Sequence, residues 1–298
     1  MSVLVAGSLH LDVVVRAPRL PASDETLMGD GVDYVCGGKG GNQAVAAARM
    51  GAVTHMAGKV GDDIFAPILV ENLKSAGVGI SVIQHGTGER SGMSAAIVEH
   101  SGDYGAVVVS AANKTIDVGE IMLPPDLRVL VLQNEIPESV NRQVAELAKG
   151  AGANVVLNAA PMRTMDPQVL ALCDVLIVNR VEASALFGRP CENRQNALEI
   201  AAHARGFSSL VITLGGDGVV LRSGTDAARH FPAYPVSVHS THGAGDTFAG
   251  ALAARLDAGD SVEAALPFAQ AAAALLVSTS LENRHLLDAK AVLKFMET

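Results

Sequence analysis

The sequence has little cysteine for a chain of 298 residues. Cys36, Cys173 and Cys191 are too few and too scattered for a disulfide framework or a thiolate metal site. Free cysteines suit a reducing compartment, so we expect a cytoplasmic protein.

Positive charge and long apolar stretches are also scarce. The chain has 22 Lys and Arg against 31 Asp and Glu, a net charge of −9. Binding to a phosphate backbone needs clustered Lys and Arg, so we expect no nucleic-acid partner. No stretch reaches the ~20 uninterrupted apolar residues of a membrane helix, and the N-terminal run has no basic start and soon meets Asp12. We therefore expect no membrane contact and no secretory signal.

Apolar residues make up 49% of the chain, enough for a large core. From residue 129 a repeated unit pairs a short β-branched run with a helical pattern, and the runs cover 129–135, 154–161, 175–182 and 210–216. Such runs are typical of strands buried on both faces, and this spacing predicts a mostly parallel sheet within one α/β domain, 1–298.

Each of these runs includes, at or near its end, a side chain that can bind or ionise. The four are Glu135, Asn158, Asn179 and Thr213. Because open α/β sheets bind ligands beyond the carboxyl ends of their strands, the four predict one shared crevice. The alternative is that polar residues follow strands simply because loops are solvated.

Two other segments, 11–36 and 89–113, have short strand-like runs and glycine-containing turns but no helical stripe. The second indicates a hairpin that turns at residues 101–103. We expect them to form a small β-sheet beside the main one, as a lid or a surface for a homodimer.

The segment GGKGGNQAVAAARMG (37–51) predicts a helix that starts at a glycine-rich turn and ends at Gly51. It is neither a Walker A loop nor a dinucleotide fingerprint. Glycines there let a ligand approach backbone N–H groups, and Asn42 offers a donor and an acceptor to a polyol. A tight strand-to-helix turn without a ligand is the alternative.

A second small-residue turn, Gly243–Ala244–Gly245, comes directly before Asp246. It leaves the N–H groups of a helix's first turn open to an anion such as a phosphoryl group. Asp246 is then placed to take a proton from an attacking hydroxyl. The alternative is that Asp246 only N-caps the helix.

The segment STHGAGDTFAGAL (240–252) resembles the C-terminal signature of the ribokinase-like, or PfkB, family of carbohydrate kinases. The earlier glycine-rich segment, together with Gly61 beyond it, is similar to that family's N-terminal signature; the matching residues are Gly37, Gly38, Gly40, Asn42, Ala44, Gly51 and Gly61. The resemblance covers nearly the whole chain. It implies a three-layer α/β/α fold with a small β-sheet lid, and an ATP-dependent kinase for the hydroxymethyl group of a sugar.

The resemblance also implies roles for individual residues. Asp246 would be the catalytic base, and the N–H groups of Gly243, Ala244 and Gly245 would form the anion hole. The sugar contacts would be Asp12, Gly38, Lys39, Asn42, Glu135 and Asp246. ATP would meet Asn179, Glu182, Thr213, Gly215, Gly218 and Gly245, with Glu182 binding Mg²⁺ through water.

Within the family, the first signature and LQNEIPESV (132–140) look most like members that convert D-ribose to ribose 5-phosphate. A ketohexose or nucleoside acceptor is the alternative, and a non-catalytic sugar or nucleotide sensor is a remote one.

Three departures bear on function. Ser240, close to His242, stands where these kinases usually carry an aspartate that helps to hold a monovalent cation, which puts potassium activation in question. His10 replaces a common asparagine, and the stretch 275–292 lacks the family's usual pattern near the adenine. Sugar preference and nucleotide specificity are therefore open.

Overall fold

The computed structural model describes residues 1–101 and 103–297. It contains a nine-stranded sheet and a separate four-stranded sheet. The large sheet has, in spatial order, β13 (Arg229–Phe231), β12 (Val219–Ser223), β11 (Ser209–Thr213), β10 (Val175–Asn179), β9 (Asn154–Asn158), β8 (Leu127–Gln133), β1 (Ser2–Ala6), β4 (Thr54–Val60) and β5 (Ile83–His85). In this spatial order the neighbouring strands from β5 to β11 pair in parallel, whereas β12 is antiparallel to both of its neighbours, β11 and β13.

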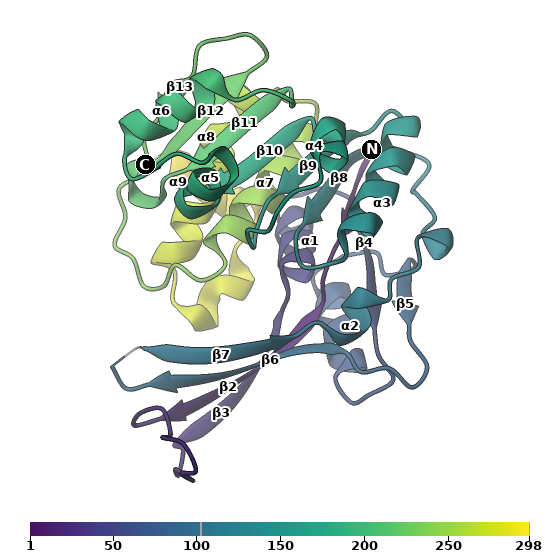
Figure 1. Ribbon diagram of the computed structural model, residues 1–298, viewed down its shortest axis with the longest axis vertical. Helices are drawn as coiled ribbons and strands as arrows, with labels where there is room; N and C mark the ends of the chain where they lie inside the picture. Colours follow the sequence, from purple (N-terminus) through teal and green to yellow (C-terminus); the bar gives the residue numbers. More distant parts are fainter. Residues whose placement is uncertain (102, 298) are drawn as a thin grey trace.

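Helices cover both faces of this sheet, because its strands alternate between two apolar cores. Val3 and Val5 of β1 join one core, and Leu4 and Ala6 join the other. The first core is covered by α1 (Lys39–Arg49), α2 (Ala66–Ser75), α7 (Ala244–Asp257), α8 (Val262–Ser278) and α9 (Ala289–Met296). The second is covered by α3 (Glu138–Gly150), α4 (Pro167–Leu172), α5 (Arg180–Phe187) and α6 (Arg194–His203). The predicted three-layer arrangement is confirmed (Figure 1).

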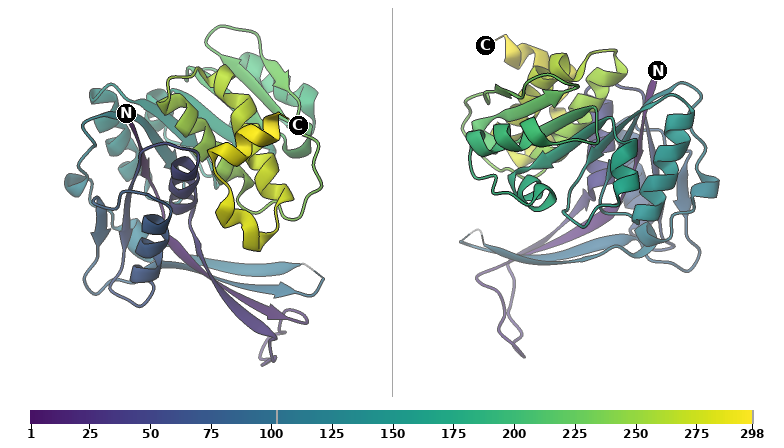
Figure 2. Two further views of the ribbon diagram at one scale, coloured as in Figure 1. Left: turned by 180° about the vertical axis from the view of Figure 1, so that it is seen from behind. Right: turned by 45° about the horizontal axis from the view of Figure 1, so that its top comes forward.

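The small sheet projects from one end of the molecule (Figure 2). Its order is β3 (Gly31–Gly37), β2 (His10–Ala17), β6 (Gly92–Glu99) and β7 (Tyr104–Val109). β2 and β6 are parallel and the outer pairs are antiparallel, so β6 and β7 form the expected hairpin. Gly102, in its predicted turn, lies outside the described residues. The segments 11–36 and 89–113 thus build one sheet, which we call the lid.

Short 3-10 helices connect several of these elements: η1 (Ala111–Lys114), η2 (Val118–Glu120), η3 (Gly215–Asp217) and η4 (Leu281–Leu286). Among residues 1–101 and 103–297, none of the helices has the length and apolar character needed to cross a membrane.

Close packing of α1 on α7 brings the two glycine-rich segments together. A Cβ atom on Gly250 would lie 2.6 Å from the Cβ of Ala46 and 2.8 Å from the backbone nitrogen of Ala47. Only glycine lets the two helices approach this closely. The N-terminal ends of both helices therefore lie beside the carboxyl ends of the central strands.

Candidate active site

Asp246 is the third residue of α7 and is only 9% exposed. Its Oδ1 accepts a hydrogen bond of 2.9 Å from Gln43 Nε2, and its Oδ2 accepts one of 3.3 Å from Asn42 Nδ2. The residue at the N-cap is Gly243, so the alternative in which Asp246 caps the helix is wrong. The carboxylate is held by α1 instead of by its own helix.

Burial raises the pKa of Asp246 above its ordinary value. The positive charge of Lys39 and the hydrogen bonds from Gln43 and Asn42 oppose this effect and favour the ionised form. A buried carboxylate with a raised pKa is a stronger proton acceptor than an exposed one. The site therefore suits a general base.

The turn before Asp246 contains backbone N–H groups that have no acceptor within the helix. Gly243 has φ 79°, a left-handed conformation that favours glycine, and starts the helix there. The N–H of Ala244 donates back to the carbonyl of Thr241 at 3.2 Å. The N–H groups of Gly245 and Asp246 belong to the first turn, which offers them no intrahelical acceptor. These two are the donors best placed for an anion.

A cavity of about 220 Å³ opens in front of this turn. Asn158, Asn179 and Thr213, at the carboxyl ends of β9, β10 and β11, all line it. Three of the four residues predicted to share a crevice therefore line this cavity, whereas the fourth, Glu135, lies beside the lid. The other lining residues are Lys39, Ala160, Ile177, Glu182, Thr241, Gly243, Ala244, Gly245 and Asp246.

Asn179 and Glu182 cap the start of α5. The side chain of Asn179 accepts from the N–H of Glu182 at 2.9 Å, and Glu182 Oε2 accepts from the N–H of Asn179 at 2.8 Å. Glu182 is 6% exposed, and burial raises its pKa. This capping box fixes the carboxylate at the cavity wall.

The residues of the cavity wall fit a magnesium ion. They offer the Glu182 carboxylate together with the side-chain oxygen of Asn158, and Mg²⁺ prefers oxygen ligands. Among the described residues no cluster of three or more acidic, His or Cys side chains forms a metal cage. Mg²⁺ commonly uses one or two carboxylates and keeps several waters, so such a cage is not required.

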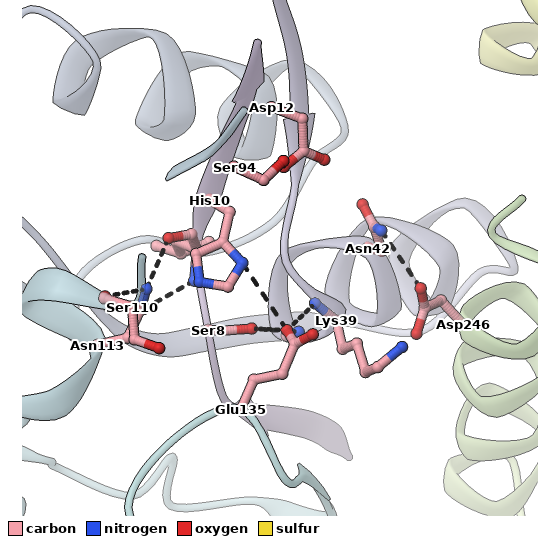
Figure 3. A network of polar contacts seen from close by, with 12 residues as sticks. Ser8, His10, Asp12, Lys39, Asn42, Ser94, Ser110, Asn113, Glu135 and Asp246 are labelled. Carbon is pink, nitrogen blue, oxygen red and sulfur yellow. Dashed lines mark hydrogen bonds and ion pairs between the residues drawn. The ribbon is translucent and has the colours of Figure 1, made fainter. Parts of the chain in front are cut away.

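A second polar group lies between the lid and α1 (Figure 3). Glu135 Oε2 accepts from the Ser8 hydroxyl and, at 2.8 Å, from the N–H of Lys39. Glu135 therefore fixes the glycine-rich turn at the start of α1. The side chain of Lys39 extends from this turn toward Asp246 (Figure 3).

Two further residues of this group come from the lid. Asp12 Oδ1 accepts from the hydroxyl of Ser94 on the neighbouring strand. The imidazole of His10 is 4% exposed, its Nδ1 lies 4.0 Å from Glu135 Oε2, and burial lowers its pKa. Asp12, Asn42, Glu135 and Asp246, expected from four separate stretches of sequence, thus surround one region.

Other expected residues lie farther out. Gly215 and Gly218 form the turn between β11 and β12, beyond Thr213. Ser240 and His242 belong to the loop that leads into α7, and their backbone carbonyls accept hydrogen bonds from Arg284.

A family model described as "pfkB family carbohydrate kinase" matches residues 1–286. The chain belongs to this family. It is a carbohydrate kinase, and the resemblance of the two signatures is confirmed.

Individual relatives of this carbohydrate kinase agree in length and fold. It is 37% identical over 280 residues to a ribokinase of Bacillus subtilis, covering 93% of this chain and 92% of the relative. It is 32% identical over 286 residues to a deoxyribokinase of Salmonella typhi, covering 93% of each. The structure of Arabidopsis thaliana ribokinase complexed with ribose and ATP superimposes with a TM-score of 0.92 at 32% identity, covering 100% of this chain and 99% of the other.

Sequence reasoning missed several residues of the kinase site. Gln43 was not singled out, although a glutamine amid the glycines and alanines of a buried helix is itself a signal of a polar partner. Gln133, which donates to Gln43, and Ser8, which donates to Glu135, were also missed. Arg284 lies in the stretch 275–292 that departs from the family's usual pattern, but nothing local singles out the arginine itself.

Proposed function

We propose that this carbohydrate kinase transfers the γ-phosphoryl group of Mg-ATP to the hydroxymethyl group of D-ribose, giving ribose 5-phosphate and ADP. The observation that carries the proposal is the buried carboxylate of Asp246, held by Gln43 and Asn42 at the mouth of a cavity with open N–H groups. The ribokinase relatives support ATP and ribose as its substrates.

In the proposed reaction the sugar lies between the lid and α1, and the phosphate chain lies in the cavity. Asp246 takes the proton of the sugar hydroxyl as its oxygen attacks the γ-phosphorus. The bond from that phosphorus to the β,γ-bridging oxygen breaks, and ADP leaves with the electron pair. The N–H groups of Gly245 and Asp246, together with the ammonium of Lys39, stabilise the charge on the transferred group.

The remaining residues have binding roles in this proposal. Asp12, Gly38, Asn42 and Glu135 orient the sugar, and Gly243 and Ala244 shape the turn at the phosphate. Lys39 spans the sugar and phosphate sides, because its N–H binds Glu135 and its side chain lines the cavity. The nucleotide is bound by Asn179, Glu182, Thr213, Gly215 and Gly218. Mg²⁺, when bound, neutralises phosphate charge, and Glu182 would hold it through water.

The choice of acceptor is tested by a coupled ADP-release screen. Ribose, 2-deoxyribose, a ketohexose and a nucleoside are compared at equal concentration, because one relative is a deoxyribokinase. We expect the highest kcat/KM with ribose. If ribose caused no ADP release while another compound did, ribose would be ruled out as the acceptor. ATP turnover with any acceptor would exclude a non-catalytic sensor.

A homodimer through the lid is part of the proposal. Val13 is paired with Tyr34 and Ala95, and Ala95 with Val107, so these side chains share the face opposite Asp12. Tyr34 is 62% and Val107 is 68% exposed. A second copy would cover this apolar face with its own, as two sheets pack in a sandwich. Sedimentation analysis should show that the wild type is a dimer and that the Val107→Lys variant is a monomer. A monomeric wild type would contradict the proposed homodimer.

Three further expectations stay predictions. One is that residues 1–298 act as one domain, and another is that the protein, whose three cysteines are free, is cytoplasmic. The third concerns potassium. The carbonyls of Ser240 and His242 already accept from Arg284, which supports a kinase whose rate is the same in potassium and sodium buffers.

A further inference from the structure

Arg284 joins backbone carbonyls from two segments that are distant in sequence. Its Nη2 donates to the carbonyl of Ser240 at 2.6 Å, and its Nη1 donates to the carbonyl of His242 at 2.8 Å. Its Nε donates to the carbonyl of Thr279, which follows α8, at 3.3 Å. One guanidinium group therefore spans the loop before α7 and the end of α8.

The loop that Arg284 holds leads directly into the anion-binding turn. The N–H groups of His239 and Ser240 both donate to the carbonyl of Val277 in α8, at 2.8 and 3.3 Å. These bonds fix the start of the loop on α8. Arg284 extends the attachment to His242, the residue immediately before Gly243.

We propose that Arg284 is a positioning residue, which sets the anion-binding turn so that the N–H groups of Gly245 and Asp246 point at the transferred phosphoryl group. This inference deepens the proposed function and rests on it. Arg284 does not line the cavity in front of the turn, so its effect on the reaction is exerted through the loop.

The chemistry of the site suits an arginine. Its planar guanidinium presents five N–H donors in a fixed fork, so one side chain serves several carbonyl oxygens at once. Its charge is permanent at physiological pH, although partial burial lowers its pKa. Arg284 is itself held from behind, because its own carbonyl accepts from Arg49 Nη1 at 3.3 Å.

The test compares Arg284→Ala and Arg284→Gln with the wild type, using the sugar with the highest turnover in the acceptor screen. Misplacing a catalytic group by ~1 Å costs roughly 100-fold in rate, so we expect kcat to fall about 10- to 100-fold. The sugar KM should stay within about twofold, because all the proposed sugar contacts except Asp246 lie at the start of α1, just after β8 and on the lid. Arg284→Lys, which keeps the charge, should retain more activity than Arg284→Gln.

Rescue distinguishes positioning from mere stabilisation. Carbonyl oxygens left without their donor attract a small cation, so free guanidinium ion at millimolar concentration should restore much of the kcat of Arg284→Ala, and potassium is a second probe. Arg205 is the matched control, since this exposed residue also donates to two backbone carbonyls, those of Ala202 and Ala204, and does not line the cavity. Arg205→Ala should keep wild-type kcat with or without guanidinium.

Two results would overturn the inference. One is a kcat for Arg284→Ala within about twofold of wild type. The other is a loss of kcat that follows a fall in Tm and that neither guanidinium nor lysine reverses, because this indicates a purely structural role. Failure of the proposed function is distinguishable from these results, because it would appear in the wild type as a preferred acceptor other than ribose. The ratio of the variant kcat to the wild-type kcat would then be measured with that acceptor.

Discussion

The side-chain amide of Gln43 donates to the carboxylate of Asp246 at 2.9 Å, joining two residues that are 203 positions apart in sequence. The orientation of this amide is fixed from behind, because Gln43 Oε1 accepts from Gln133 Nε2 at 2.9 Å. With its oxygen engaged in this way, Gln43 presents its NH₂ group to Asp246. Both glutamine side chains are fully buried, so water does not compete for these bonds.

Gln43→Leu should reduce kcat and shift its pH dependence. A hydrogen bond to a charged group contributes about 1.5–3 kcal/mol, so we expect a loss of roughly 10- to 100-fold at neutral pH. The bond favours ionised Asp246, and its removal raises the pKa of that carboxyl further. Because the reaction needs the ionised base, the acidic limb of the kcat profile moves to higher pH. Stopped assays over a pH series measure this shift.

Gln195→Leu is the matched control, since Gln195 donates to Glu199 Oε1 at 2.9 Å on an exposed face of α6. It should leave both kcat and the pH profile unchanged. An unshifted acidic limb in Gln43→Leu would show that the contact with Asp246 has no bearing on the base.

Asp246→Asn should keep substrate binding but lose turnover by about 10²–10⁴-fold, the usual cost of removing a general base. It should also stabilise the protein at neutral pH. Burial raises the native pKa of Asp246, so the wild type loses stability as the pH rises through that pKa. Below the ordinary carboxyl pKa of ~3.9 the difference in Tm between the two proteins should vanish. Near-wild-type turnover, or a variant less stable at pH 7, would contradict these expectations.

Glu182→Gln should raise the Mg²⁺ concentration required for half-maximal activity with little change in Tm. A glutamine oxygen can still accept from the N–H of Asn179, so the capping box persists while the charge at the cavity wall is lost. Glu138→Gln is the control, because Glu138 Oε1 accepts from the N–H of Asp166 away from the cavity. An unchanged Mg²⁺ titration for Glu182→Gln would remove Glu182 from the proposed magnesium site.

The parts of the site that the sequence predicted are local in the chain. The turn before Asp246 and the polar ends of β9, β10 and β11 follow from short patterns, because secondary structure alone brings parallel strand ends to one edge. Glu135 is the residue for which this prediction fails, because it does not line the cavity. It follows β8 in the same way, but it accepts from Ser8 and Lys39 and lies 4.0 Å from His10 of the lid.

The parts that the sequence did not predict depend on packing between distant elements. The contact of Gln43 with Asp246 exists because Gly250 lets α7 approach α1, and no local pattern encodes that approach. The bonds from Arg284 depend in the same way on η4 lying against the loop before α7. Asp246 alone was equally consistent with a helix cap; the structure has Gly243 at the N-cap and the Asp246 carboxylate bonded to Gln43 and Asn42 of α1.

Gly245→Ala should reduce kcat sharply without harming the fold. Apart from its chain neighbours and the backbone of its own helix, no atom of residues 1–101 and 103–297 lies within 4 Å of a Cβ built on Gly245. The residue lines the cavity, so the new methyl group would occupy space that the phosphoryl group needs. We expect kcat to fall about 100-fold, since a displacement of ~1 Å has that effect. The Tm should hold or rise, because alanine is favoured over glycine in a helix by ~0.5–1 kcal/mol. Gly150→Ala, at an equally open position that ends α3, is the control and should keep full activity. Wild-type kcat in Gly245→Ala would mean that the phosphoryl group does not approach this turn.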